Sequence, residues 1–246
     1  MLKHKYSVFI FFVLLAILFF TKASTFFYVL LFLSFLAITT WGAFDIRLNY
    51  FTKAICKSNP THKKNIAITF DDGPHEKTPE ILDVLMKYNA KATFFCIGKN
   101  VEAFPGIYAQ IMFEGHAVGN HTQHHVNGWK VSDEEYLHDI TTAAKHIKSN
   151  LFRPPYGRIK RSQIKKIKQQ FPAMRIVMWD VLSADFDTSL NADACLGYTV
   201  YHSKSGSIVL FHDSEKAFPR MQTALPKMLA HFAAKGYTFE AIKFNA

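Results

Sequence analysis

Three histidines within one short stretch are the first residues of this sequence that could do chemistry. The segment "GNHTQHH" covers residues 119–125 and contains His121, His124 and His125. Histidine is the commonest metal ligand in proteins and the usual proton carrier near neutral pH. On a helical turn His121 would share one face with either of the other two, which follow it by three and four positions. The spacing alone therefore leaves open which pair could bind a metal, and whether the segment is only a polar loop.

Two adjacent aspartates offer a further ligand and a base. Asp71 and Asp72 follow the apolar run "NIAITF" (residues 65–70) and precede a Gly-Pro pair that sharpens the turn. Adjacent carboxylates at a strand end point in different directions, so one can bind a metal while its neighbour accepts a proton from water. Two imidazoles and one carboxylate suit a catalytic zinc with an open position. By itself, Asp-Asp-Gly is also a common surface turn.

The elements that must position these residues alternate between strand and helix. Short apolar runs predict strands over 65–70, 91–98, 116–121, 151–155, 175–183, 206–213 and 237–242. Helical spacing predicts helices over 78–89, 101–114, 132–149, 158–170 and 192–203, with another between the last two strands. We expect Thr78 to be the N-cap of its helix with Pro79 as the first helical residue, and Ser132 to open a capping box with Glu135. This βα alternation predicts an α/β fold with a mostly parallel sheet, open or closed into a barrel.

In such folds the functional groups collect at the carboxyl ends of the strands. Four expected strand ends carry carboxylates or imidazoles, namely Asp71 and Asp72, His121 and His125, Asp180 and Asp185, and His212 and Asp213. A divalent metal at such a site lowers the pKa of bound water to ~7 and polarises a carbonyl oxygen. With a carboxylate base and a histidine acid, the set could hydrolyse an amide or an ester.

Five motifs then resemble one enzyme family. They are "TFDDGP" (69–74), "HTQHH" (121–125), "RPPYG" (153–157), "WDVLSADF" (179–186) and "LFH" (210–212). Their order and spacing are similar to those of the polysaccharide deacetylases, also called the NodB-homology group or carbohydrate esterase family 4, over residues 65–246. The resemblance implies a distorted (β/α) barrel of about seven strands. It also implies metal-dependent removal of N-acetyl groups from N-acetylglucosamine units of an acetylated glycan, either peptidoglycan or a chitin-like oligosaccharide.

The resemblance also implies a role for each matching residue. The implied ligands of a divalent metal, expected to be zinc, are Asp72, His121 and His125, which places His124 at a variable position. The implied catalytic residues are the base Asp71, the acid His212, Arg153 to orient the base, Asp185 to tune the acid, and Tyr156, whose backbone N–H would face the oxyanion. The implied substrate-binding residues are Pro154, Tyr156, Phe186 and Leu210, the last as the wall of the acetyl-methyl pocket.

Some positions depart from the family pattern or lie outside it. The fourth motif ends Asp185-Phe186 where the family usually has Asp-Trp, which keeps an aromatic wall but no indole N–H. Asp180 lies where the family more often has a small residue, and we expect it to be a capping or surface carboxylate. Five further histidines match no motif and are expected to be surface or packing residues, namely His116, His138, His146, His202 and His231.

The first 44 residues are almost entirely apolar after a basic start. Residues 8–44 as one helix would be about 55 Å long, well beyond the ~30 Å hydrocarbon core of a bilayer. We therefore expect two membrane helices, about 7–20 and 25–44, followed by a linker over 45–64 and the catalytic domain over 65–246. A cleaved signal peptide is the alternative, but no small-residue cleavage site precedes a polar mature start. We expect a membrane-anchored protein of a bacterial inner membrane.

The charge pattern bears on the orientation of this anchor. The chain has a formal net charge of +10, and cations follow the apolar segment at Arg47, Lys53, Lys57, Lys63 and Lys64. Under the positive-inside rule two spans would leave the catalytic domain in the cytoplasm, whereas one span would place it outside. The sequence leaves the two open.

Other partners and functions receive less support. The basic segment 158–170 has the pattern of an amphipathic surface helix, so we expect no nucleic-acid partner, and we expect a monomer. The thiols of Cys56, Cys96 and Cys195 are too scattered for a disulfide framework or a metal knuckle. Two alternative functions remain, a membrane-anchored deacylase of a small or lipid-linked amide or ester, and a glycan-binding protein without turnover. The filled catalytic positions argue against the second.

Overall fold

The structure is a computed structural model that describes residues 3–45, 48–51, 53–58 and 64–242. The chain divides into two compact units, Met1–Ala54 and Ile55–Ala246. The division falls inside the stretch expected to be a linker. In the second unit Ile55 pairs with Val177, and Lys57 pairs with Ser207.

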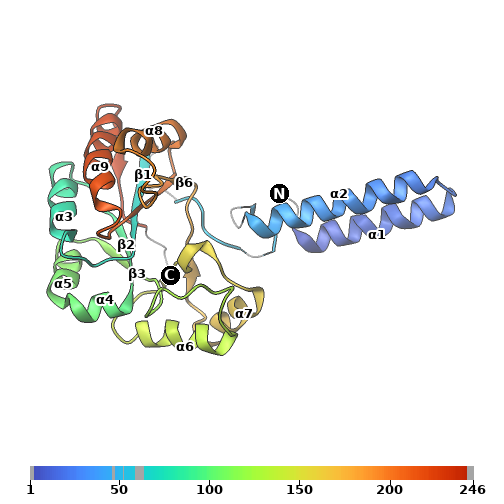
Figure 1. The fold of residues 1–246 in the computed structure, drawn as a ribbon, viewed down its shortest axis with the longest axis horizontal. Coiled ribbons are helices and arrows are strands. Elements are labelled where there is room, and N and C mark those ends of the chain that lie inside the picture. Colours follow the sequence, from blue (N-terminus) through green and yellow to red (C-terminus); the bar gives the residue numbers. More distant parts are fainter. Residues whose placement is uncertain (1–2, 46–47, 52, 59–63, 243–246) are drawn as a thin grey trace. The chain divides into compact units, whose positions relative to one another are not determined.

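The first unit is a hairpin of two apolar helices, α1 (His4–Phe20) and α2 (Thr25–Phe44), which lie side by side (Figure 1). The rings of Phe11 and Phe35 meet across the hairpin with centroids 4.6 Å apart. Most apolar side chains of both helices are exposed, as they would be in contact with lipid.

Of these two helices, α2 is long and apolar enough to cross a membrane, whereas α1 is shorter. Both lie close to the predicted ranges of 7–20 and 25–44. A helix of this length and composition near the N-terminus is also typical of a signal sequence.

The second unit is built on a sheet of eight parallel strands. They are β1 (Asn65–Asp71), β2 (Thr93–Cys96), β3 (Ala117–Asn120), β4 (Leu151–Phe152), β5 (Arg175–Ile176), β6 (Val181–Leu182), β7 (Ile208–His212) and β8 (Thr238–Phe239). Seven of them follow the order β5-β4-β3-β2-β1-β7-β6, and β8 pairs with β1. The prediction of a distorted (β/α) barrel of about seven strands is confirmed.

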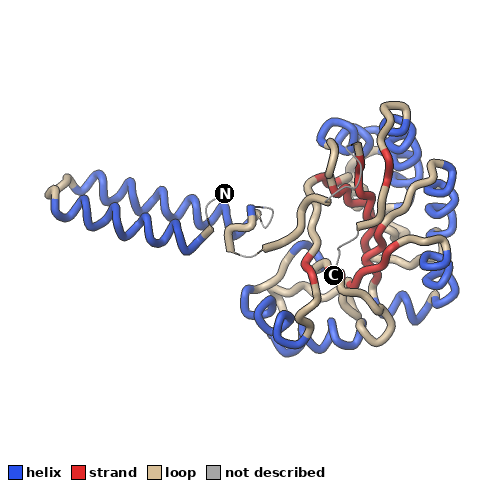
Figure 2. The backbone as a smooth tube through the Cα atoms, turned by 180° about the vertical axis from the view of Figure 1, so that it is seen from behind, coloured by secondary structure: helices blue, strands red, loops and turns tan. Residues whose placement is uncertain are grey.

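Helices cover the outside of this sheet (Figure 2). They are α3 (Thr78–Lys87), α4 (Gly98–Ala103), α5 (Pro105–Phe113), α6 (Asp133–Ala143), α7 (Arg161–Gln170), α8 (Ala192–His202), α9 (Phe218–Ala233) and the short 3₁₀ helix η2 (Pro155–Gly157). Their inner faces follow the expected spacing, as in α3, where Ile81, Leu82 and Leu85 are buried.

Three predicted elements differ from the structure. The helix expected over 101–114 is broken between α4 and α5, because Pro105 has no N–H to continue the first helix and begins the second. The helix expected over 132–149 ends at Ala143, although Ser132 caps it and accepts from the backbone N–H of Glu135 as predicted. The strand expected over 175–183 is two short strands, β5 and β6, at opposite ends of the strand order.

The core lies around β1, which pairs with β2, β7 and β8. Every residue of β1 is buried, which explains its continuous apolar run. Phe70 stacks on Phe94 of β2 with ring centroids 4.9 Å apart, and its ring centroid lies 6.1 Å from that of Phe211 on β7. This packing fixes the register in which Asp71, at the end of β1, lies beside His212 at the end of β7.

Candidate active site

The carboxyl ends of the strands surround a cavity of about 840 Å³. Its lining brings together eight of the predicted site residues, namely Asp71, Asp72, His121, His125, Tyr156, Phe186, Leu210 and His212. The other three, Arg153, Pro154 and Asp185, are buried outside the lining. A volume of this size is typical of a pocket that accommodates a ligand larger than an acetyl group.

Asp71 is held by a buried arginine. Nη1 of Arg153 donates to Oδ1 of Asp71 at 2.7 Å and to the hydroxyl of Thr69 at 2.9 Å. The other guanidinium nitrogens donate to backbone carbonyls, Nε to Val177 and Nη2 to Met178. An arginine bound on several sides has little freedom, so it fixes the orientation of the Asp71 carboxylate.

The opposite oxygen of Asp71 faces a cluster of three potential metal ligands. Asp72, His121 and His125 each present one ligand atom, and these atoms lie within 4.8 Å of one another. Nε2 of His125 is 3.3 Å from Oδ1 of Asp72, and Nε2 of His121 is 3.7 Å from the same oxygen. Oδ2 of Asp71 also lies 3.7 Å from Nε2 of His121. The base position and the cluster are therefore adjacent.

The chemistry of this cluster fits a divalent metal. Nδ1–H of His121 donates to the backbone carbonyl of Arg153 at 2.7 Å, so its Nε2 is left with a free lone pair. Burial and the neighbouring charge of His121 lower the pKa of His125 to about 4, which keeps that imidazole neutral. Oδ1 of Asp72 is buried and has no hydrogen-bond partner among the described residues. Two imidazoles and one carboxylate are ligands that zinc accepts.

The loops that carry the cluster adopt unusual backbone conformations. Asp72, Thr122, His125 and Tyr156 all have positive φ, at 80°, 65°, 58° and 59° respectively. Residues with side chains rarely adopt this region, and for the β-branched Thr122 it is a true outlier. Strain of this kind persists where the surrounding structure imposes it, commonly at functional sites.

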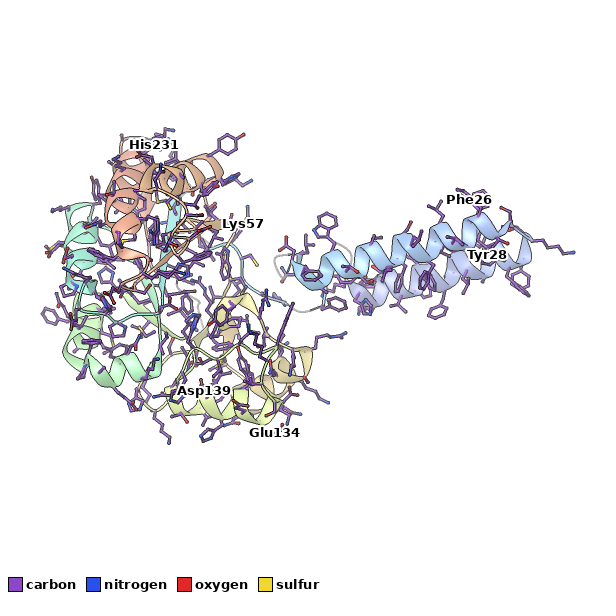
Figure 3. The ribbon with its side chains drawn as sticks, in the orientation of Figure 1. Phe26, Tyr28, Lys57, Glu134, Asp139 and His231 are labelled. Carbon is purple, nitrogen blue, oxygen red and sulfur yellow. The ribbon has the colours of Figure 1, made fainter. Side chains whose placement is uncertain are left out.

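The third histidine of the segment points elsewhere. Nδ1 of His124 is 2.6 Å from Oδ1 of Asp139, and the His124 side chain is 63% exposed. Asp139, on α6 (Figure 3), also accepts from the backbone N–H groups of Gln123 and His124. The structure thus separates His124 from the pair His121 and His125, and it gives His124 a part in holding the loop.

The other side of the cavity carries a histidine in the opposite electrostatic state. Nδ1–H of His212 donates to Oδ1 of the buried Asp185, and the backbone N–H of His212 donates to Oδ2, both at 2.8 Å. Burial alone would lower the pKa of His212, but the hydrogen bond and charge of Asp185, with the charges of Asp72 and Asp71, raise it to about 9. At neutral pH this imidazole is protonated and can donate a proton.

Aromatic and apolar side chains complete the cavity. The ring of Phe186 meets that of His212 edge-on with centroids 5.1 Å apart, and the ring of Tyr156 lies 4.6 Å from that of His125. Tyr156 is 61% exposed, whereas Leu210, which also lines the cavity, is buried. Pro154 is buried and does not line the cavity.

Two polar residues of the predicted strands, Asp180 and His116, make structural contacts and do not line the cavity. Asp180 accepts from the backbone N–H of Ile208 at 2.7 Å and from the hydroxyl of Ser207 at 3.0 Å, so it joins β7 to the segment before β6. His116, outside the motifs, accepts at Nδ1 from the backbone N–H of Ala92, and burial with the charge of Lys91 lowers its pKa to about 4. Both agree with the structural roles expected for them.

Asp213 is a buried residue to which the sequence assigned no role. Its backbone N–H donates to the carbonyl of Asp71, and its Oδ2 accepts from the hydroxyl of Thr78 at 2.7 Å. A Cβ on Gly73 would lie 2.2 Å from Oδ2, so only glycine fits there. Thr78 is therefore not the N-cap of α3, which is Lys77. Adjacency to His212 is the one sequence signal for Asp213, because its contacts to the turn after β1 are long-range.

The comparisons with known proteins agree with this geometry. The family model described as Polysaccharide deacetylase matches residues 58–171. A peptidoglycan-N-acetylglucosamine deacetylase of Bacillus cereus is 37% identical over 190 residues, which are 74% of this chain and 68% of the relative. The chain belongs to the polysaccharide deacetylase family.

Two further members of the family show how far the similarity extends. A chitooligosaccharide deacetylase of Azorhizobium caulinodans is 34% identical over 160 residues, 62% of this chain and 75% of that protein. A crystal structure of a peptidoglycan N-acetylglucosamine deacetylase, bound to a naphthalenyl N-hydroxybenzamide, superimposes with a TM-score of 0.69 at 36% identity. That match covers 75% of this chain and 89% of the crystal chain. The family and its fold thus extend over most of the second unit.

Proposed function

We propose that this polysaccharide deacetylase removes N-acetyl groups from N-acetylglucosamine units of a glycan with the help of a divalent metal. The observation that carries the proposal is the arrangement around one cavity. Three potential metal ligands lie on one side, His212 with its bonds to Asp185 lies on the other, and the carboxylate of Asp71 lies next to both. The names of the relatives, which are peptidoglycan and chitooligosaccharide deacetylases, support the choice of substrate.

Asp72, His121 and His125 would hold the metal, and zinc suits this donor set. When bound, such an ion polarises the acetyl carbonyl and lowers the pKa of a coordinated water. The lowered pKa of His125 keeps that imidazole neutral, so little free energy is lost in deprotonating it. The backbone carbonyl of Arg153 fixes the ring of His121 with Nε2 toward the cluster.

Asp71 would act as the general base. Its Oδ1 is occupied by Arg153, so Oδ2, which faces the cluster, is the oxygen free to accept a proton from the attacking water. The guanidinium of Arg153, which is itself bound on several sides, holds this carboxylate in position. The buried charge of Arg153 is itself balanced by Asp71, and its Cζ lies 4.0 Å from the ring centroid of Phe95.

His212 would act as the general acid. Asp185 holds the imidazole by Nδ1, which leaves Nε2–H to donate to the leaving amine nitrogen. The raised pKa keeps the proton on the ring until the amine departs. The same two bonds to Asp185 hold the ring at the wall of the cavity, close to Phe186.

The remaining residues would bind the substrate and the developing charge. The backbone N–H of Tyr156, at a positive φ of 59°, is proposed to stabilise the oxyanion of the tetrahedral intermediate. Leu210 would contact the acetyl methyl group, and the exposed rings of Tyr156 and Phe186 would pack on sugar faces, with Pro154 supporting this wall from below.

Acetate release tests this proposal. The purified full-length chain with zinc should release acetate from peptidoglycan or chitin oligomers, lose this activity with a chelator and recover it when zinc is restored. Asp71→Asn should lower kcat by at least about 100-fold, because general bases typically contribute that much. Asp83→Asn, an exposed aspartate on α3, is the matched control and should keep full activity. Near wild-type acetate release by Asp71→Asn would contradict the assignment.

The two alternative functions have distinct outcomes in the same assay. A deacylase of lipid-linked sugars would release acetate from a lipid-linked N-acetylglucosamine and not from soluble oligomers. A glycan-binding protein without turnover would bind the oligomers and release none. Neither is favoured by a specific contact, whereas the proposed base, acid and metal ligands all line one cavity, which supports hydrolysis.

The α1–α2 hairpin is proposed to anchor the enzyme in a bacterial inner membrane. Its exposed apolar side chains support this, and α2 has the length to span a bilayer. The hairpin should remain with the membrane after alkaline extraction. Fusions of alkaline phosphatase or a cytosolic fluorophore after Ala246 would report on which side the catalytic domain lies.

A further inference from the structure

Three cations line the cavity outside the proposed catalytic set. They are Lys130, Arg158 and Lys216. Lys130 lies in the loop between β3 and α6, Arg158 follows η2, and Lys216 lies between β7 and α9. All three side chains are exposed, and they come from three different βα units. The mouth of one cavity thus collects positive charge from separate parts of the chain.

These charges are not neutralised by neighbouring carboxylates. Within the part of the chain that the structure describes, none of the three forms an ion pair. The guanidinium of Arg158 lies 4.9 Å from the ring centroid of Trp129, and Lys216 acts on the charge of Asp187 only from a distance. Both contacts leave the cationic groups available to a ligand.

The carboxylates of the cavity are already compensated. Asp71 pairs with Arg153 at 2.7 Å. Asp72 belongs to the proposed metal site, where the ion would balance its charge, and Asp185 pairs with the protonated His212. With the metal in place, the field at the mouth of the cavity is set by the three cations. A cleft with one sign of charge concentrates ligands of the opposite sign.

We infer that this enzyme selects substrates that carry an anionic group next to the target N-acetylglucosamine, on a neighbouring sugar or as a diphosphate, with Lys130, Arg158 and Lys216 as specificity-determining residues. The inference rests on the proposed function and narrows its substrate class. A carboxylate on the lactyl or peptide substituent of muramic acid supplies such a charge in a peptidoglycan strand. A diphosphate supplies it in a lipid-linked sugar. A chitin oligomer of N-acetylglucosamine alone is neutral and lacks it.

The cavity has room for this recognition. At about 840 Å³ it is far larger than an acetyl group, so the neighbouring sugar and its substituent would lie at the mouth when the acetyl group lies at the base. Exposed cations at the rim of a binding site act mainly on association and on its salt dependence. They should therefore change kcat/KM more than kcat.

Acetate release from substrates matched in length tests the inference. The full-length zinc enzyme would be assayed with a chitin tetrasaccharide, with a peptidoglycan tetrasaccharide, and with the latter after methyl esterification of its carboxylates. A diphosphate-linked N-acetylglucosamine forms the fourth arm and separates the two sources of charge. We expect kcat/KM to be about tenfold higher for an anionic substrate at low salt, and the preference to shrink at high salt.

Variants then assign the preference to the three cations. Replacing Lys130, Arg158 and Lys216 by Gln should each lower the ratio of kcat/KM for anionic over neutral substrate by about two- to fivefold, and the triple variant should bring it close to one. Lys168→Gln, an exposed lysine on α7 outside the cavity, should leave the ratio unchanged.

Two results would overturn the inference. One is an equal kcat/KM for the esterified and the free peptidoglycan oligomer, and the other is a preference that the triple variant retains. In either case acetate release itself would continue, and the proposed deacetylase function would stand. Acetate release from none of the four substrates would instead overturn the proposed function, and the inference with it.

Discussion

The two walls of the cavity use the same side chain in opposite states. On one wall His125 has a pKa lowered to about 4, and on the other His212 has a pKa raised to about 9. Both rings are largely buried, so burial cannot explain the difference. The neighbours do, since His125 lies beside His121 with ring centroids 5.0 Å apart, whereas His212 bonds to the buried carboxylate of Asp185. The neighbouring group therefore decides whether each histidine suits the proposed role of metal ligand or of acid.

This contrast would allow one small site to hold a divalent cation and a protonated imidazole together. A divalent ion and a protonated imidazole repel each other, so each needs its own negative partner. Asp72 supplies this negative partner on the wall that carries the proposed ligands His121 and His125, here called the metal wall. Asp185 supplies it on the wall that carries His212, here called the acid wall. Asp71 lies between them, with its own partner in Arg153. Each wall can therefore be altered separately, and the predictions below do so.

The largest effect should come from removing a ligand on the metal wall. His125→Ala should weaken zinc binding by more than about 100-fold, since even the residues that support metal ligands contribute 10- to 100-fold. Acetate release should fall with it. The measurement is zinc content and affinity of the purified full chain.

His124→Ala is the matched control for this prediction. Its ring is exposed and bonded to Asp139, so this variant should retain zinc. Loss of zinc from His124→Ala, or its retention by His125→Ala, would show that the wrong histidine has been placed at the metal.

A smaller effect is expected from removing the charge of Asp185, which bonds to the proposed acid His212. In Asp185→Asn the pKa of His212 should fall from about 9, because the hydrogen bond and the charge of Asp185, which oppose burial most strongly, are then lost. His212 donates its proton only below its pKa, so the alkaline limb of the kcat profile should move from about pH 9 to lower pH. At pH 8 kcat should drop by at least about tenfold.

Asp180→Asn serves as the control for that profile. Asp180 lies close in sequence but bonds to Ser207 and Ile208 away from the cavity, so this variant should keep an alkaline limb near pH 9. An unshifted limb in Asp185→Asn would mean that another group, not His212, donates the proton.

The smallest effect should come from removing the buried carboxyl group of Asp213, which lies against Gly73 in the turn after β1. Burial, with the charge of Asp72 and against the hydrogen bond of Thr78, raises the pKa of Asp213 to about 7 from 3.8. An acid with a raised pKa in the folded state destabilises that state as pH rises from about 4 to 7. Asp213→Asn cannot ionise, so its Tm relative to wild type should rise by a few degrees between pH 5 and pH 8.

This last measurement is best made on chelator-treated protein, because a bound metal ion would offset the effect of Asp72 on the pKa of Asp213. A Tm difference between wild type and Asp213→Asn that does not change with pH would show that the buried carboxyl remains ionised throughout. It would then be a paired anion like Asp71 and not a group close to its protonation midpoint.

Much of the fold followed from the sequence because its signals are local. β1 was predicted over 65–70 and ends at Asp71, since a strand buried on both faces leaves a continuous apolar run. The break at Pro105 was visible in the sequence, but the apolar positions on either side of it concealed the interruption. The separation of β5 from β6 was not predicted, because Val177, between them, pairs with the distant Ile55.

The candidate site residues could be predicted from the motifs, but the contacts that hold these residues in place could not. Spacing alone left His124 and His125 as equivalent partners of His121, and the family pattern distinguished them. What holds His124 away is Asp139 on α6, and what lies beneath the turn after Asp72 is Asp213. Both are single aspartates with no periodic pattern around them. Their roles depend on contacts between distant segments, which one sequence does not reveal.

The most direct test of the division between the two walls is His212→Ala, with zinc content and acetate release measured on the same sample. If His212 is the acid and not a ligand, the variant should bind zinc as wild type does, while its kcat falls by about 100-fold or more. Loss of zinc together with activity would place His212 on the metal wall. Wild-type acetate release with zinc in place would contradict its role as the proton donor.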